Sequence, residues 1–175
     1  EGRPNILFIM ADDLGFGDLQ SYGHPRIQTP HLDQLAKDGT RFTQYYKAHS
    51  VCSPSRVALM TGQYPSRWNV YAHFAWLGHN ARRGMPDWLS GEAPSLPQML
   101  QRTGYRTAHF GKWHLGGGSG RIWRGKAINS ADAPPVTAYG FDVARSFVGN
   151  GPTWRGTELR DEAHDLYPLA DDEFL

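Results

Sequence analysis

The strongest constraint on the fold comes from the apolar run ILFIMA at residues 6–11, which ends abruptly at two adjacent acids, Asp12 and Asp13. A continuous apolar run of this length is typical of a strand covered on both faces, as in the parallel sheets of α/β proteins. Open α/β sheets place their functional sites at the carboxyl ends of such strands. The run therefore predicts a buried strand, and it makes the two acids candidates for a site.

The next segment, TPHLDQLAKDG, has the punctuation of a helix. Thr29 is a candidate N-cap, Pro30 suits the first helical position, and Gly39 suits the C-terminal cap. After it, RFTQYY at residues 41–46 predicts a short strand. The first part of the chain is thus expected to run strand, helix, strand.

Two more helices are expected further along. One starts near Ser53 or Pro54 and ends at Gly62, and the other has Ser95 as its cap and Gly104 as its stop. Together with the segments before them, these helices give the alternating pattern of an α/β fold.

The last part of the chain divides at the glycines of GKWHLGGG. Residues 105–116 predict a strand that breaks at Gly116. Residues 117–175 are rich in Gly, Pro, Asp and Arg and have little apolar periodicity, so long surface loops with at most one short element are expected there.

Composition excludes some classes of partner. The chain has 175 residues, enough for one domain with a real core. Lys plus Arg is 18 and Asp plus Glu is 17, so the net charge of +1 gives no basis for proposing nucleic acid or an anionic membrane as a partner. No apolar run approaches the roughly 20 residues of a membrane span.

The adjacent acids Asp12 and Asp13 have two readings. Two carboxylates held close together repel each other, and a divalent cation removes that penalty; Ca²⁺ in particular takes hard oxygen ligands. A solvated turn or a helix cap also uses such acids. The pair alone leaves both readings open.

The single cysteine, Cys52, has no partner for a disulfide within the chain. With a helix starting at Ser53 or Pro54, it lies at or just before the N-cap, where free N–H groups and the helix dipole favour an anion. Arg56 can direct its guanidinium group to the same anion. The alternative is a small, half-apolar side chain in a core. A cysteine phosphatase is excluded, because that chemistry requires arginine where Ala58 stands.

The motif GKWHLG brings a cation close to an imidazole. On an extended strand, Lys112 and His114 point to one face and Trp113 to the other. Such a pair can bind an oxyanion and protonate a leaving group, although an ordinary surface strand also explains it. Five other basic residues are expected to be plain surface or loop residues: His73, His79, Arg82, Arg83 and His109.

Taken together, these segments resemble the sulfatase family. The sequence CSPSR fits the family's C-x-P-S-R signature, and GKWHLG fits its second signature. The resemblance covers about residues 3–116 with its motifs in the expected order, and a family-like YGFD follows at 139–142. The other matching segments are PNILFIMADDLGFGDL and TPHLDQLAKDGTRF.

The resemblance implies an alkaline-phosphatase-like α/β fold, with a mostly parallel central sheet and helices on both faces, present here as a partial domain. It also implies hydrolysis of aryl or carbohydrate sulfate esters. In this family a separate formylglycine-generating enzyme oxidises the signature cysteine, here Cys52, to Cα-formylglycine. One hydroxyl of its hydrated diol attacks sulfur in line and releases the alcohol, and the second then expels sulfate.

The resemblance assigns a role to each matching catalytic residue. Arg56 would orient the diol and help to ionise it. Lys112 would hold sulfate oxygens, and His114 would bind the diol or assist its deprotonation. These positive groups offset the charge that develops in the transition state.

The resemblance also assigns a Ca²⁺ site, with Mg²⁺ as the alternative, to Asp12, Asp13 and the modified Cys52. The family completes this site with a downstream Asp-Asn pair, which does not occur after residue 116; Asp171 and Asp172 lack its context. We therefore expect residues 1–175 to be the N-terminal part of a sulfatase catalytic domain. On its own, the chain is expected to be inactive and to bind Ca²⁺ weakly.

Two other functions stay open at this point. One is a phosphonate or phosphate monoester hydrolase of the same superfamily, and the other is a catalytically inactive binding module or fragment. The resemblance further implies export to the periplasm, the outside of the cell or the lysosome, with EGRPN as a mature start.

Overall fold

The structure, a computed structural model, describes residues 2–116 and 132–147 and four further short strands. These strands form two antiparallel pairs, β2 (Ile122–Trp123) with β3 (Lys126–Ala127) and β5 (Thr153–Arg155) with β6 (Glu158–Arg160). The chain divides into two compact units, Glu1–Tyr46 and Lys47–Leu175, which are described separately. Asp171 and Asp172 lie outside the described residues.

The first unit contains a short 3-10 helix, η1 (Gln20–Tyr22), and the helix α1 (Pro30–Asp38). The helix expected between Pro30 and Gly39 is confirmed. Thr29 does not cap it through the backbone N–H groups; instead its hydroxyl donates to the Asp33 carboxylate at 2.9 Å and accepts from the Gln20 N–H at 3.1 Å. Thr29 therefore ties α1 to η1.

The strands expected over residues 6–11 and 41–46 are wrong for the described structure. Neither segment forms a β-ladder, and side chains of the first run are exposed, Leu7 to 84% and Ile9 to 77%. A strand is held by hydrogen bonds to a neighbouring strand, and no described segment pairs with either one. An apolar pattern is therefore not sufficient for a strand when no neighbouring strand is present among the described residues.

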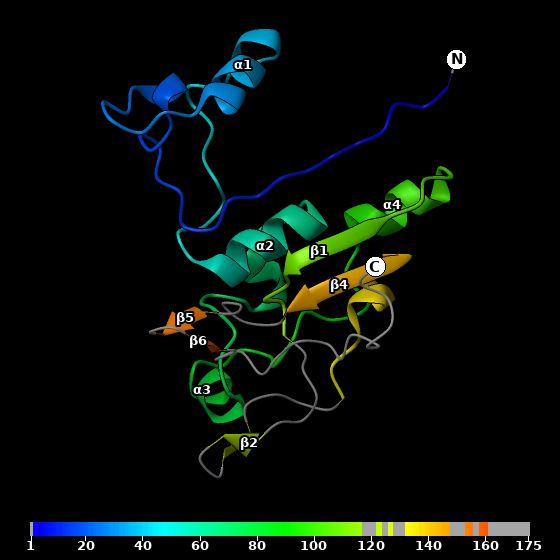
Figure 1. Ribbon diagram of the computed structural model, residues 1–175. Coiled ribbons are helices and arrows are strands. Elements are labelled where there is room, and N and C mark those ends of the chain that lie inside the picture. Colours follow the sequence, from blue (N-terminus) through cyan, green and yellow to red (C-terminus); the bar gives the residue numbers. More distant parts are fainter. Residues whose placement is uncertain are drawn as a thin grey trace. The chain divides into compact units, whose positions relative to one another are not determined.

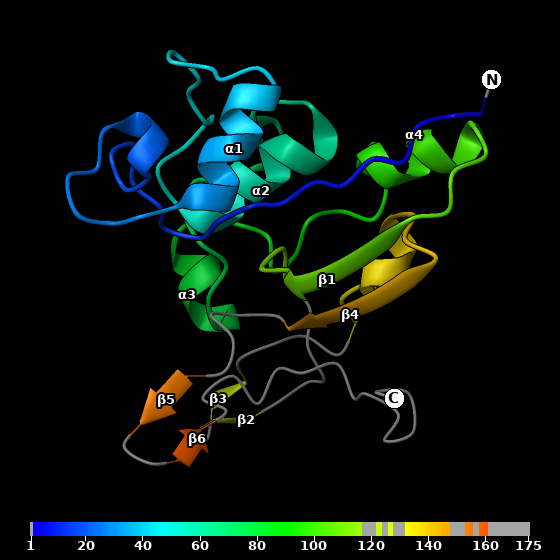
Figure 2. The same ribbon diagram turned by 45° about the horizontal axis from the view of Figure 1, so that its top comes forward.

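The second unit is built around two parallel strands, β1 (Ala108–Lys112) and β4 (Val143–Phe147), which run side by side in the same direction (Figures 1 and 2). Their register pairs Ala108 with Val143 and Lys112 with Phe147. The unit also has four helices before β1 and one 3-10 turn before β4: α2 (Cys52–Thr61), η2 (Pro65–Trp68), α3 (Leu77–Arg82), α4 (Leu96–Arg102) and η3 (Val136–Tyr139).

The helix boundaries follow local chemistry. α2 ends where Gly62 adopts a left-handed φ of 67° and donates its N–H to the Ala58 carbonyl. It begins at Cys52, slightly before the expected start, because Val51 is still extended and acts as N-cap. In α4 the Ser95 hydroxyl accepts from the Gln98 N–H at 3.3 Å, as its capping role predicts.

Two elements differ from the sequence-based expectation. α3 forms between the helix expected to end at Gly62 and the one expected to begin after Ser95, where no apolar periodicity marks it. The tail holds more than one short element, because η3, β4 and the four short strands all lie after residue 117. β4 gains its strand conformation by pairing with β1, a long-range contact that composition does not report.

Trp113 and Tyr139 lie at the centre of the core of the second unit, each 1% exposed, with ring centroids 5.0 Å apart. Burial of such rings supplies the main driving force for packing the helices on the strand pair. The rest of this core comprises Val57, Met60, Val70, Phe74, Met85, Leu89, Ala93, Leu115 and Val136.

Gly116 closes the GKWHLG motif against the segment before α4. It forms an antiparallel bridge with Trp88 and has a φ of 88°. A Cβ atom at this position would lie 2.4 Å from the Trp88 Cα, so only glycine fits. Next to the bridge, the Leu89 N–H donates to the Leu115 carbonyl at 2.9 Å. These contacts fix the chain directly after β1.

Among the described residues, no helix is long and apolar enough to cross a membrane.

Candidate active site at the end of strand β1

The first turn of α2 meets the carboxyl end of β1, as Figure 1 shows. The Lys112 ammonium group lies 3.4 Å from the sulfur of Cys52. From the next turn of the helix, the Arg56 guanidinium group donates to the Lys112 carbonyl at 2.5 Å. The structure therefore brings together three of the predicted site residues, at the strand end where α/β sheets place their sites.

His114 joins the site by a route that strand alternation did not predict. β1 ends at Lys112, and His114 has a left-handed φ of 52°. The expectation that Lys112 and His114 share one face of an extended strand is therefore wrong. The change of backbone direction buries Trp113 and His114 together, at 1% and 8% exposure. Positive φ is uncommon for a residue other than glycine, and it tends to occur at functional sites.

The imidazole of His114 is held in one tautomer. Its Nε2 atom lies 3.1 Å from the Phe74 carbonyl, which can only accept, so Nε2 carries the proton. Nδ1 is buried and has no hydrogen-bond partner among the described residues. Burial, followed by the charges of Lys112 and Arg56, lowers the pKa of His114 to about 4. The ring is thus neutral at pH 7, with an unused lone pair on Nδ1.

Ser53 anchors the chain that follows α2. This side chain is fully buried, and its hydroxyl accepts from the Phe74 N–H at 2.9 Å. Phe74 is therefore held on one side by the start of α2 and on the other by His114. The preceding residue, His73, comes to lie with its ring centroid 6.3 Å from that of His114.

The expectation that His109 is a plain surface or loop residue is wrong, because its side chain is half-buried and feels the charge of Arg56. Its Nδ1 lies 2.6 Å from the Ser146 hydroxyl, which joins β1 to β4, and its ring packs against Trp113 and Phe141. Burial, with a smaller effect of Arg56, lowers the pKa of His109 to about 4. The alternation of side chains along β1 could have indicated this, because His109 points to the opposite face from its exposed neighbours Ala108 and Phe110.

The acids Asp12 and Asp13 belong to the first unit. One carboxylate oxygen from each lies within 4.8 Å of the other, and Asp13 has a φ of 59°. Two carboxylates at this separation are hard oxygen donors that fit Ca²⁺ or Mg²⁺. Cys52 lies in the second unit, and its share in a metal site with the acids stays a prediction.

A family model for sulfatases matches residues 4–158. The chain belongs to the sulfatase family. Members use a formylglycine made from a cysteine and a divalent metal ion, and the chain carries a cysteine, Cys52, beside the Lys112 ammonium group.

Three curated sulfatases illustrate the likeness. The chain is 46% identical over 120 residues to arylsulfatase H of Homo sapiens, and 50% identical over 115 residues to arylsulfatase A of Bos taurus. It is 42% identical over 118 residues to N-acetylgalactosamine-6-sulfatase of Homo sapiens. These alignments cover 65%, 66% and 65% of this chain but only 20%, 22% and 22% of the relatives. The chain thus spans about a fifth of their length.

Solved structures agree. The crystal structure of Ps i-CgsB matches with a TM-score of 0.64 and 34% identity, over 83% of this chain and 28% of the other. The structure of BT4656 in complex with its substrate, D-glucosamine-2-N,6-O-disulfate, matches with a TM-score of 0.63 and 30% identity, over 85% of this chain and 24% of the other. The expected alkaline-phosphatase-like α/β fold, as a partial domain, is confirmed.

Proposed function

We propose that the protein containing this chain hydrolyses sulfate esters and that Cys52 is the precursor of its formylglycine. The observation that carries the proposal is the 3.4 Å approach of the Lys112 ammonium group to the Cys52 sulfur, at the carboxyl end of β1. Family membership and the arylsulfatase relatives support the same chemistry. When present, formylglycine supplies the hydroxyl group that attacks sulfur.

Two cations prepare this place for a sulfate group. The Lys112 ammonium group would donate to the sulfate oxygens. This charge-assisted hydrogen bond is stronger than one between neutral groups, and the site is partly buried. Arg56, 8% exposed, fixes the Lys112 carbonyl and adds a second positive charge near Cys52. Because both cations are fixed before substrate binds, they stabilise the charge that develops on sulfate without reorganising.

His114 acts as a proton acceptor. Its Nε2–H donates to the Phe74 carbonyl, which leaves the buried Nδ1 lone pair as its one acceptor. Since the lowered pKa keeps the ring neutral at pH 7, Nδ1 can accept a hydrogen bond from a hydroxyl group at position 52 and so bind the diol or assist its deprotonation.

Asp12 and Asp13 would hold Ca²⁺, with Mg²⁺ as the alternative. The cation would neutralise the mutual repulsion of the carboxylates and attract the anionic substrate. Ca²⁺ takes about six to eight oxygen ligands, so two acids make a weak site by themselves. The 175-residue chain alone is accordingly expected to bind Ca²⁺ weakly and to lack turnover.

The proposed substrate class is a sulfated carbohydrate. N-acetylgalactosamine-6-sulfatase is a relative by sequence, and BT4656 was solved with a sulfated glucosamine. By family resemblance, a formylglycine-generating enzyme is the proposed partner during maturation. The same resemblance suggests that the protein is exported to the periplasm, the outside of the cell or the lysosome.

The test uses the protein from its complete reading frame, co-expressed with a formylglycine-generating enzyme. Mass spectrometry of the Cys52 peptide should show a loss of about 18 Da, the change from CH₂SH to CHO. The protein should hydrolyse 4-nitrophenyl sulfate, and Cys52→Ala should not. Full activity of Cys52→Ala, or an intact thiol in active enzyme, would overturn the mechanism.

The same preparation separates the alternatives. A phosphonate or phosphate monoester hydrolase would turn over aryl phosphonates or phosphates faster than the aryl sulfate. An inactive binding module would turn over none of these esters even with Cys52 fully converted.

A further inference from the structure

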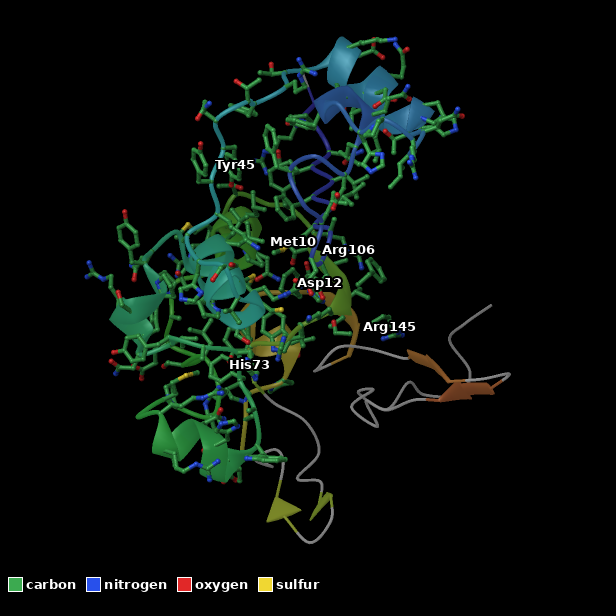
Figure 3. The ribbon with its side chains drawn as sticks, turned by 90° about the vertical axis from the view of Figure 1, so that its left-hand side faces the viewer. Met10, Asp12, Tyr45, His73, Arg106 and Arg145 are labelled. Atoms are coloured by element: carbon green, nitrogen blue, oxygen red, sulfur yellow. The ribbon has the colours of Figure 1, made fainter. Side chains whose placement is uncertain are left out.

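The segment between α2 and α3 places a second histidine outside His114. His73 is exposed, whereas His114 is buried, and their ring centroids lie 6.3 Å apart. Burial, then the charges of Arg83 and Lys112, lower the pKa of His73, which places its imidazole within the electrostatic reach of both cations. Figure 3 shows His73 on the stretch of chain that leads toward α3. His73 therefore lies at the surface beside the buried His114 and feels the charge of Lys112, the residue that contacts Cys52.

This stretch is held rigidly by buried polar contacts. Asn80, which is 0% exposed, accepts from the Ala75 N–H at 2.8 Å, and its amide group donates to the Ala75 carbonyl at 2.9 Å and to Asp87 at 3.0 Å. Arg83 donates to the His73 carbonyl at 3.2 Å. With Phe74 tied to Ser53, the backbone of His73 is fixed from both directions.

The surroundings of His73 are positively charged. His79 and Arg82 lie in the last turn of α3, and Arg83 follows directly. Burial, then Arg83 and Arg82, lower the pKa of His79. The acid of this stretch, Asp87, is half-buried and accepts from the Asn80 amide group. The rim outside His114 is therefore basic and attracts anions.

We propose that His73 and Arg83 bind the alcohol part of the sulfate ester and favour an alcohol that carries a second anionic group, a carboxylate or a further sulfate. This inference rests on the proposed hydrolysis of sulfate esters. The sulfate group occupies the inner position beside Lys112 and Cys52, so the part of the ester that reaches the solvent side is the alcohol. There His73 can hydrogen-bond a hydroxyl group, while Arg83 pairs with the second anion through its forked N–H groups.

The test compares three substrates of the complete, formylglycine-containing protein: 4-nitrophenyl sulfate, a monosulfated sugar, and the same sugar with a second sulfate or a carboxylate. The wild type should prefer the sugar with two anionic groups. Arg83→Gln should lower kcat/KM for that sugar about tenfold, mainly through KM, and leave kcat/KM for the aryl sulfate within about twofold. His73→Gln should lower kcat/KM for both sugars and leave kcat/KM for the aryl sulfate unchanged.

The control is Arg102→Gln, because Arg102 is the exposed last residue of α4, whereas Arg83 directly follows the last residue of α3. This variant should leave kcat/KM unchanged for all three substrates. Inhibition by inorganic sulfate separates binding from misfolding: its inhibition constant should stay unchanged in His73→Gln and Arg83→Gln, because sulfate occupies the inner position.

The outcomes distinguish the two proposals. A wild type that hydrolyses no sulfate ester overturns the proposed function. A wild type that hydrolyses the aryl sulfate but shows no preference for the sugar with two anionic groups overturns this inference alone. So do variants that affect all substrates equally or none of them.

Discussion

The ammonium group of Lys112 lies 3.4 Å from the sulfur of Cys52, although one residue ends a strand and the other begins a helix. The contact exists because α2 packs with its first turn at the carboxyl end of β1. It places a fixed positive charge beside the proposed precursor of the nucleophile, and this charge can be tested directly.

Lys112→Met removes the charge but keeps most of the side chain's length. We expect the turnover of 4-nitrophenyl sulfate to fall by about 10²–10³-fold, the usual effect of deleting one preorganised donor. The measurement is kcat at saturating substrate, with Lys47→Met as the exposed control. Near-normal turnover by Lys112→Met would contradict the role of this lysine in holding sulfate.

Ser53→Ala removes the buried acceptor of the Phe74 N–H. We expect a loss of about 1–3 kcal/mol in the free energy of unfolding, because the N–H group is left buried and unpaired. Urea unfolding measures this loss. Ser66→Ala, at an exposed position, should be nearly neutral. Equal stabilities of the two variants would argue against the anchor.

Gly116→Ala should be strongly destabilising. The new Cβ would meet the Trp88 Cα at 2.4 Å, and the φ of 88° disfavours alanine, so we expect a cost of at least about 2 kcal/mol. The control is Gly78→Ala, since Gly78 lies within α3 and its Cβ would meet nothing within 4 Å. That change should raise stability slightly. Thermal unfolding of both variants decides.

His109 should make stability depend on pH. Its pKa in the folded protein is about 4, below the ordinary histidine value of 6.5, so the unfolded chain binds the proton more tightly. The contribution of His109 to stability is therefore complete above pH 6.5. It is lost as the pH drops from 6.5 to about 4, with a slope of at most about 1.4 kcal/mol per pH unit. His109→Gln should flatten the profile of urea unfolding against pH, whereas His31→Gln, exposed on α1, should not.

Removal of the metal should abolish activity reversibly. Treatment with a chelator is expected to stop the hydrolysis of 4-nitrophenyl sulfate, and Ca²⁺ should restore it. Asp13→Asn should raise the Ca²⁺ concentration needed for half-maximal activity by tenfold or more, about 1.4 kcal/mol. Asp38→Asn, an exposed change in α1, should leave that concentration unchanged. A metal-independent Asp13→Asn enzyme would contradict the assignment.

Local signals predicted α1, α2 and α4 but not α3. Pro30 and Gly39 delimit α1, Gly62 ends α2, and Ser95 caps α4, because these residues act through their own backbone and nearest neighbours. Strands were harder, since a strand forms only with a partner. Residues 6–11 have the apolar pattern but no partner strand among the described residues. No local pattern marks β4, which forms a strand because it pairs with β1.

The family was predictable from the amino-acid sequence, because the spacing of its motifs can be read without coordinates. The same motifs singled out Cys52, Arg56, Lys112 and His114. Long-range packing brings three of these together: α2 packs against the end of β1, so Lys112 contacts Cys52 and Arg56 donates to the Lys112 carbonyl. It also decided that His114 leaves the strand and that His73 lies beside it. Contacts of this kind depend on burial and backbone direction, which long-range packing sets and local sequence does not encode.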